Sequence, residues 1–163
     1  MKIADLNQMD RAAFLMAIGH VYEDTPWVAE RAWGQRPFTS LDALCDAMQG
    51  AVANAAPVEQ LALLRAHPDL GTRARIGEAS TREQSGAGLD RLTPEEHSRL
   101  LRLNADYQQK FGFPFLYAVK GSGKQQILGA LEKRLALTPA DEFAEALGQV
   151  FRIARFRLED IIE

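Results

Sequence analysis

The residues best suited to chemistry in this chain begin with His67, in the segment AHPDLG at residues 66–71. A strongly helical run precedes it, and Pro68 cannot continue that helix, because proline lacks an N–H donor and restricts the residue before it. His67 is therefore expected at a helix break. An imidazole titrates near neutral pH and can donate or accept a hydrogen bond, which suits it to proton transfer. The alternative is that His67 only caps the last carbonyls of its helix.

A second polar group lies in the segment EQSGAGL at residues 83–89. Glu83 and Gln84 stand at the entry to a glycine-rich turn, and glycines allow the backbone to approach a small ligand closely. The alternative is a capping box, in which Ser80 begins a helix and the Glu83 side chain reaches back to the start of that helix. The sequence alone leaves both interpretations open.

The last helical segment carries the third polar group, an arginine. At about 100° per residue, Arg157 falls in line with Val150 and Ala154 on the edge of an apolar stripe, whereas Arg155 lies on the opposite flank. Arg157 is therefore expected to point inward. A guanidinium in that position requires a carboxylate, either from a ligand or from a protein acid such as Glu83.

Two other kinds of site have little support. The segment GSGK at residues 121–124 resembles the end of a phosphate-binding loop, but that motif needs glycine at the position of Ala118 and Ser or Thr at that of Gln125. A transition-metal site would need clustered ligands, and the histidines are far apart without helical spacing. They are His20, His67 and His97.

Length and composition favour one compact domain over residues 1–163, with 47% hydrophobic residues to build its core. A net charge of -3 gives no general attraction to nucleic acid or to an anionic membrane. The single cysteine, Cys45, excludes an intrachain disulfide and is expected as a buried thiol. No apolar run approaches the length of a membrane span. We expect a cytoplasmic protein.

Helix start signals recur along the chain while the alternation typical of strands is nearly absent, so the sequence predicts an all-α fold. Helices are expected to begin after hydroxyl caps, in three cases directly before a proline, and at one further proline. The caps are Thr25, Ser40, Thr93 and Thr138, and the further proline is Pro57.

The first predicted helix holds Phe14 and Ile18 and ends near Gly19. The last begins at Thr138 and has the most regular apolar stripe of the chain, which belongs against a core. That stripe consists of Phe143, Leu147, Val150, Ala154, Leu158 and Ile161.

Two segments are expected to be irregular. Residues 71–92 are rich in glycine and polar residues, which predicts an irregular segment with one short helix. Residues 111–119 have strand propensity, but Pro114 removes a ladder donor and no partner strand is evident. An extended, aromatic-lined loop is the better interpretation.

With these motifs in place, the chain resembles the 2-oxo-4-hydroxy-4-carboxy-5-ureidoimidazoline (OHCU) decarboxylase family of urate degradation. The resemblance covers essentially the whole length and rests on four separated segments in order. These are AHPDLG (66–71), EQSGAGL (83–89), FGFPFLYAVKG (111–121) and IARFRL (153–158). The segments PWVA (26–29) and RPF (36–38) are also similar to the family.

The resemblance implies an all-helical, commonly homodimeric enzyme that converts OHCU to (S)-allantoin and carbon dioxide without metal or organic cofactor. His67 matches the catalytic histidine, Glu83 the active-site carboxylate and Arg157 the substrate-binding arginine. The remaining matches are residues that line the site or contact substrate, in part through the backbone. They are Pro68, Gln84, Ser85, Phe113, Pro114, Phe115 and Leu116, the last in place of the family's usual isoleucine.

Two other functions compete with this expectation. The all-α pattern alone would permit a helical binding module without chemistry, and the same polar residues could serve hydrolysis or isomerisation of a related ureide. A homodimer is expected from the resemblance and from Ile153 and Phe156, apolar residues off the main stripe of the last helix.

Overall fold

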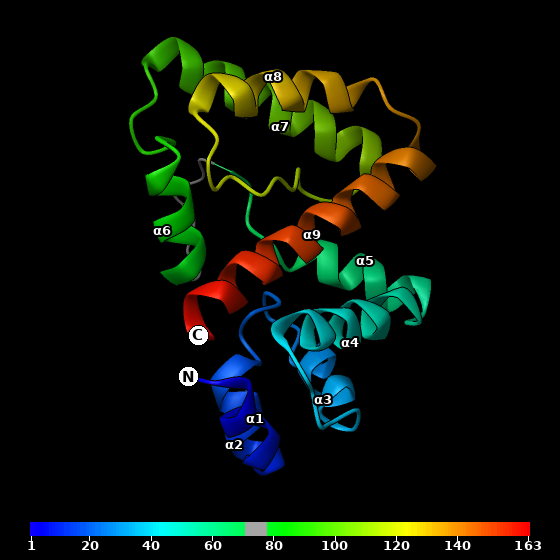
Figure 1. The fold of residues 1–163 in the computed structure, drawn as a ribbon. Coiled ribbons are helices and arrows are strands. Elements are labelled where there is room, and N and C mark those ends of the chain that lie inside the picture. Colours follow the sequence, from blue (N-terminus) through cyan, green and yellow to red (C-terminus); the bar gives the residue numbers. More distant parts are fainter. Residues whose placement is uncertain (71–77) are drawn as a thin grey trace. The chain divides into compact units, whose positions relative to one another are not determined.

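The predicted all-α class is confirmed by the computed structural model, which describes the backbone of residues 1–70 and 78–163 and the side chains of 1–70 and 82–163. The described chain contains nine helices and no strand (Figure 1). In order they are α1 (Ile3–Gln8), α2 (Arg11–Ile18), α3 (Trp27–Trp33), α4 (Leu41–Ala53), α5 (Pro57–Arg65), α6 (Glu78–Gly86), α7 (Pro94–Phe111), α8 (Lys124–Leu135) and α9 (Pro139–Ile161).

The helices are divided between two compact units. Unit 1 consists of Met1–Ala66 and Phe151–Glu163, and unit 2 of His67–Val150. Helix α9 contributes its first part to unit 2 and its last part to unit 1. No helix in the described part of the chain is both long and apolar enough to span a membrane.

In unit 1, α3 packs against both α2 and α4. Helix α4 begins as predicted, with the Ser40 hydroxyl accepting from the Ala43 N–H at 3.1 Å. The core includes Phe14, Ile18, Leu44, Met48 and Leu64, all 0–1% exposed. The two chain ends meet within this unit, because the N-terminal ammonium donates to the Ile161 carbonyl at 3.2 Å.

Cys45 lies on α4 and is a buried free thiol, as the sequence predicts. Burial raises its pKa, while the guanidinium of Arg155 acts in the opposite direction. The thiol therefore stays protonated at neutral pH and packs as a small apolar side chain.

Two expectations for unit 1 are wrong. The helix that holds Phe14 is the second of the chain, because α1 precedes it and begins where Asp5 accepts from the Lys2 N–H at 2.8 Å. Thr25 does not cap α3: its hydroxyl donates to the Glu23 carbonyl, and Pro26 is the N-cap residue. A left-handed Asp24, with φ of 44°, turns the chain just before.

In unit 2, α7 packs against α8. Thr93 and Glu96 form the capping box at the start of α7. The Thr93 hydroxyl accepts from the Glu96 N–H at 3.2 Å, and the Glu96 carboxylate accepts from the Thr93 N–H at 2.9 Å. Thr138 likewise accepts from the Asp141 N–H at 3.2 Å at the start of α9. The predicted caps at these two threonines are confirmed.

Of the two segments expected to be irregular, the structure describes one in part and the other completely. Of residues 71–92, positions 71–77 lie outside the described residues, and α6 is the short helix within the remainder. Residues 112–123 form neither helix nor strand, which confirms the extended loop. Helix α7 ends before it at Gly112, whose φ of 78° is left-handed and so favours glycine.

Candidate active site

His67 directly follows the end of α5, where Arg65 is the last helical residue and Ala66 the C-cap. Its side chain is 7% exposed. The predicted helix break at Pro68 is therefore present, and the imidazole lies in protected surroundings at the first residue of unit 2. Burial of this kind fixes a side chain in one geometry, which proton transfer requires.

Helix α7 holds the chain that follows His67. The Asn104 amide donates to the Leu70 carbonyl at 3.1 Å, and Gln108 donates to the two carboxylate oxygens of Asp69 at 3.0 and 3.2 Å. Asn104 is itself 7% exposed. Two side chains of one helix thus hold the adjacent residues Asp69 and Leu70, two and three positions after His67.

Helix α6 carries Glu83, Gln84 and Ser85. Gln84 is 8% exposed, Glu83 is half-buried, and the Ser85 hydroxyl donates to Asp90 at 2.8 Å. The turn after them is closed by the Leu89 N–H, which donates to the Gln84 carbonyl at 3.0 Å. The helix thus ends in a compact turn with these polar side chains on its last two turns.

The capping-box alternative for Glu83 does not fit this backbone. An N-cap residue precedes the first helical residue, whereas Ser80 is the third residue of α6. The Ser80 side chain itself lies outside the described side chains. The ligand-directed role of Glu83 stays a prediction.

The loop after α7 buries its side chains. Phe113, Phe115 and Leu116 are 0–5% exposed, and Pro114 is buried as well. Tyr107 contacts Phe113 and Phe115 edge to face, with ring centroids 5.8 and 5.5 Å apart. Because these side chains are buried against other residues, the groups of this loop that could contact a ligand are its backbone N–H and C=O groups.

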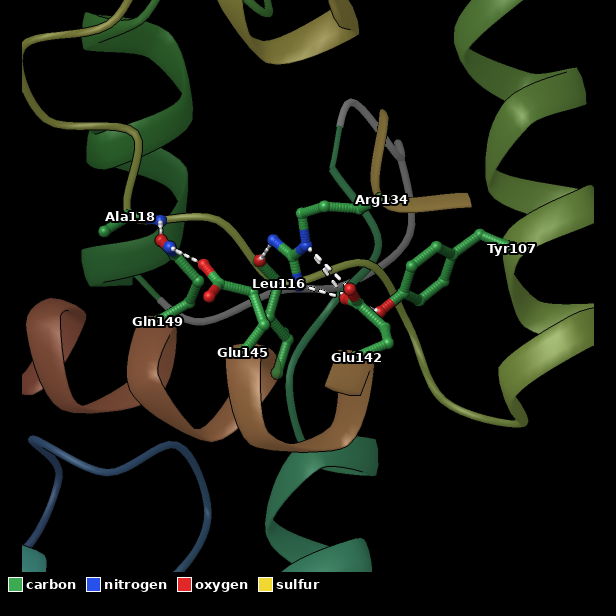
Figure 2. A network of polar contacts seen from close by, with 7 residues as sticks. All are labelled: Tyr107, Leu116, Ala118, Arg134, Glu142, Glu145 and Gln149. Atoms are coloured by element: carbon green, nitrogen blue, oxygen red, sulfur yellow. Dashed lines mark hydrogen bonds and ion pairs between the residues drawn. The ribbon is translucent and has the colours of Figure 1, made fainter. Parts of the chain in front are cut away.

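A buried charged network that the sequence analysis did not identify holds this loop (Figure 2). Arg134, at the end of α8, forms an ion pair with Glu142 of α9, and its Nε lies 2.9 Å from Oε1 of that carboxylate. The Tyr107 hydroxyl donates to the same carboxylate, and Arg134 donates to the Leu116 carbonyl. Burial and the hydrogen bond to Glu142 raise the pKa of Tyr107, so its hydroxyl remains a donor.

Arg157 points inward, as its helical phase predicts. It is 6% exposed, whereas the Arg155 side chain is 43% exposed and binds Asp42 and Glu159, each at 2.9 Å. Arg157 Nη1 lies 2.8 Å from Oε2 of Glu23 and donates to the Val21 carbonyl at 3.2 Å. Glu23, which sequence reasoning missed, is thus an ion partner of the candidate substrate arginine.

The candidate residues are distributed over both units. His67, the α6 group and the buried loop all belong to unit 2, and Arg157 belongs to unit 1. Within unit 2, shared contacts of α7 connect two of these groups, because Asn104 holds the segment after His67 while Tyr107 packs on the loop. Among the described residues, no group of three or more His, Cys, Asp and Glu side chains has a metal-binding arrangement.

Comparisons with known proteins agree over nearly the whole chain. The family model described as OHCU decarboxylase matches residues 7–159. The chain is 46% identical to a 2-oxo-4-hydroxy-4-carboxy-5-ureidoimidazoline decarboxylase of Halalkalicoccus jeotgali, over 98% of this chain and 90% of that protein. It is 44% identical to the protein of the same name from Haloferax volcanii, over 97% and 94%.

Solved structures agree as well. The crystal structure of an (S)-allantoin synthase superposes with a TM-score of 0.83 and 32% identity, covering 99% of this chain and 54% of that one. Fold and sequence together define an all-helical carboxy-lyase. The chain belongs to the OHCU decarboxylase family.

Proposed function

We propose that this chain converts OHCU to (S)-allantoin and carbon dioxide in urate degradation, and that residues 1–163 act as one functional domain. The observation that carries the proposal is the 46% identity over 98% of the chain to a relative that bears the name of this decarboxylase. The buried His67 at a helix break supports it, because a protected imidazole is the kind of group that the reaction uses.

The reaction needs no cofactor, since the substrate supplies its own electron sink. The bond between the carboxylate carbon and the ring carbon breaks, and carbon dioxide leaves. The bonding pair forms a double bond to the adjacent imine-type carbon, and the π pair of that C=N bond moves onto its nitrogen, which takes up a proton. The substrate hydroxyl then loses its proton as it becomes the product carbonyl, and one proton adds to a single face of this enolate-like intermediate and sets the S configuration. The protein has to orient and polarise the substrate.

Three side chains divide this work in our proposal. His67 hydrogen-bonds the substrate hydroxyl or carboxylate and sets the geometry of bond breaking. Glu83 and Arg157 hold the polar ends of the substrate, and a guanidinium suits a carboxylate because it donates two parallel hydrogen bonds. The burial of His67 and Arg157, at 7% and 6% exposure, supports these roles because electrostatic interactions strengthen away from water.

The remaining contacts come from α6 and the buried loop. Gln84 and Ser85 contact the substrate through their side chains, and Pro68 lines the site. The backbone of residues 113–116 hydrogen-bonds the imidazoline ring. The loop's buried side chains support this assignment, because they leave peptide groups as its polar surface.

Freshly generated OHCU tests the proposal against its two competitors. We expect the purified chain to accelerate both the ultraviolet decay of OHCU and the release of one equivalent of carbon dioxide. A binding module would bind OHCU without speeding its decay. A hydrolase or isomerase of a related ureide would consume its substrate without releasing carbon dioxide.

The two neighbouring arginines are expected to differ in kinetics. Arg157→Ala should lower kcat/KM roughly ten- to hundred-fold, because loss of a charge-assisted contact to a carboxylate costs about 1.5 to 3 kcal/mol. Arg157→Lys should lose much of this too, because an ammonium cannot reproduce the guanidinium fork. Steady-state kinetics with OHCU measure both effects.

Arg155→Ala is the matched control. Arg155 lies two residues away on the same helix, and its guanidinium forms ion pairs with the surface acids Asp42 and Glu159. Exposed ion pairs contribute about 0 to 1 kcal/mol, so its kcat/KM should stay near that of the unmodified chain. If Arg155→Ala is inactive while Arg157→Ala is fully active, the substrate-binding arginine is Arg155 and not Arg157.

We further propose a homodimer. Ile153 and Phe156 remain partly exposed on the last part of α9, and apolar side chains of this kind gain from burial between subunits. Light scattering at micromolar concentration should report the mass of two 18.1 kDa chains. Ile153→Glu should weaken the dimer about tenfold. A monomer in the unmodified chain would refute the dimer.

A further inference from the structure

The buried network around Arg134 makes contacts that stability alone does not require. Arg134 and Glu142 are 7% and 0% exposed, and Tyr107 is 0% exposed. A buried ion pair is at best weakly stabilising, because removing both charges from water offsets their attraction, and apolar residues of similar volume often serve as well. Besides Glu142, the guanidinium of Arg134 contacts the loop twice. It donates to the Leu116 carbonyl and lies over the Phe115 ring, 4.5 Å from its centroid.

The contact at Leu116 fixes one peptide plane of the loop. In a trans peptide, the C=O of one residue and the N–H of the next lie in one plane and point in opposite directions. Because the Leu116 carbonyl is directed at Arg134, the Tyr117 N–H is directed to the other side of the chain.

The next peptide plane is fixed independently by α9. The Ala118 N–H donates to Oε1 of Gln149 at 2.9 Å, and Gln149 is oriented by its own donation to Glu145, also at 2.9 Å (Figure 2). By the same geometry, the Tyr117 carbonyl is directed away from Gln149. Two consecutive planes are therefore held, and the N–H and C=O of Tyr117 are turned away from these two buried side chains.

The peptide groups of Tyr117 make no hydrogen bond to protein within the described residues. They form a donor and an acceptor on one residue, directly after the 113–116 backbone. The donor is also strengthened, because a guanidinium on the Leu116 carbonyl polarises the peptide bond to which the Tyr117 N–H belongs. Imidazoline and ureido groups present complementary N–H and C=O groups.

We propose that Arg134, Glu142 and Tyr107 are positioning residues, which hold the loop so that the backbone N–H and C=O of Tyr117 extend its substrate-binding surface. The proposal rests on the assignment of OHCU as substrate. Glu142 orients the guanidinium, Tyr107 orients Glu142, and the guanidinium orients the loop. None of the three side chains needs to touch the substrate.

The test replaces both charges together, because removal of one would leave the other buried and unpaired. In Arg134→Met/Glu142→Leu, the core keeps apolar side chains of similar volume and the Leu116 carbonyl loses its donor. The matched control is Arg99→Met/Glu132→Leu, which removes an exposed ion pair of 2.6 Å between α7 and α8 in the same unit.

The Michaelis constant for OHCU is the decisive readout, measured on protein whose circular dichroism matches the unmodified chain. A misaligned loop loses contacts to the bound substrate, so KM should rise about tenfold. A merely structural role would lower the amount of active enzyme and leave KM unchanged, since KM does not depend on enzyme concentration. The control should keep the original KM. A folded double variant with the original KM overturns the proposal.

Tyr107→Phe keeps the proposal testable if the double variant does not fold, because it removes only the hydroxyl that orients Glu142. Its KM should rise about threefold, and an unchanged KM overturns the proposal.

The ¹⁵N–¹H resonance of Tyr117 provides a readout without turnover: it should move in both network variants and not in the control. An unmodified chain that does not decarboxylate OHCU refutes the proposed function, while an unmoved Tyr117 resonance refutes the positioning role itself.

Discussion

His67→Asn should remove most of the decarboxylase activity while leaving the fold intact. Asparagine can replace the hydrogen bonds of an imidazole but cannot exchange a proton near neutral pH. Loss of a positioned proton-transfer group lowers kcat by about 10²- to 10⁴-fold. His67 follows the end of α5 and is 7% exposed, so the smaller amide fits without forcing the backbone. Steady-state kcat at neutral pH measures the effect.

The chain supplies its own controls for this substitution. His20 is exposed and His97 is half-exposed in the first turns of α7, and neither belongs to the proposed site. His20→Asn and His97→Asn should each keep near-normal kcat. Near-normal turnover in a well-folded His67→Asn protein would remove His67 from the mechanism and leave the substrate to be polarised by other groups.

Glu142→Ala should strongly lower the free energy of unfolding. It leaves the Arg134 guanidinium buried without its carboxylate, and breaking a buried ion pair in this way costs about 3 to 5 kcal/mol. The Tyr107 hydroxyl loses its acceptor at the same time. Urea unfolding, followed by circular dichroism, measures the free energy of unfolding.

Glu132→Ala is the matched control, because Glu132 also pairs with an arginine of unit 2 but is 49% exposed. It should cost about 0 to 1 kcal/mol. Arg134→Met/Glu142→Leu should be more stable than Glu142→Ala, since no unpaired charge remains. If Glu142→Ala and Glu132→Ala lose equal stability, the Glu142 carboxylate is not the buried partner described above.

Local sequence signals predicted much of the helical framework. Ser40, Thr93 and Thr138 cap their helices because each hydroxyl accepts a backbone N–H within one turn, a contact set by residues that are neighbours in the chain. The break at Pro68 and the inward phase of Arg157 follow equally from local geometry. Such features depend little on the rest of the fold.

The errors arise where local signals are ambiguous. Thr25 before Pro26 has the pattern of a helix cap, but the left-handed Asp24 turns the chain so that the Thr25 hydroxyl donates to the Glu23 carbonyl. Helix α1 has only six residues and one buried side chain, Leu6, so its apolar periodicity is too short to detect.

The buried network was missed because each of its charges has an ordinary local explanation. Glu142 lies in the first turn of α9 and Arg134 in the last turn of α8. Exposed acids at the start of a helix and exposed bases at its end commonly interact favourably with the helix dipole. Tertiary packing buries both instead. Glu23 was missed for a related reason, since it meets Arg157 across 134 positions of sequence. Pairing between distant residues leaves no trace in a single sequence.

The handedness of the product tests the central claim most directly. Circular dichroism should be recorded while the purified chain acts on freshly generated OHCU, with the uncatalysed decay followed in parallel. We predict the rapid appearance of dextrorotatory (S)-allantoin, since protonation on one face requires substrate held in a chiral site. Racemic allantoin forming at the uncatalysed rate would contradict the account.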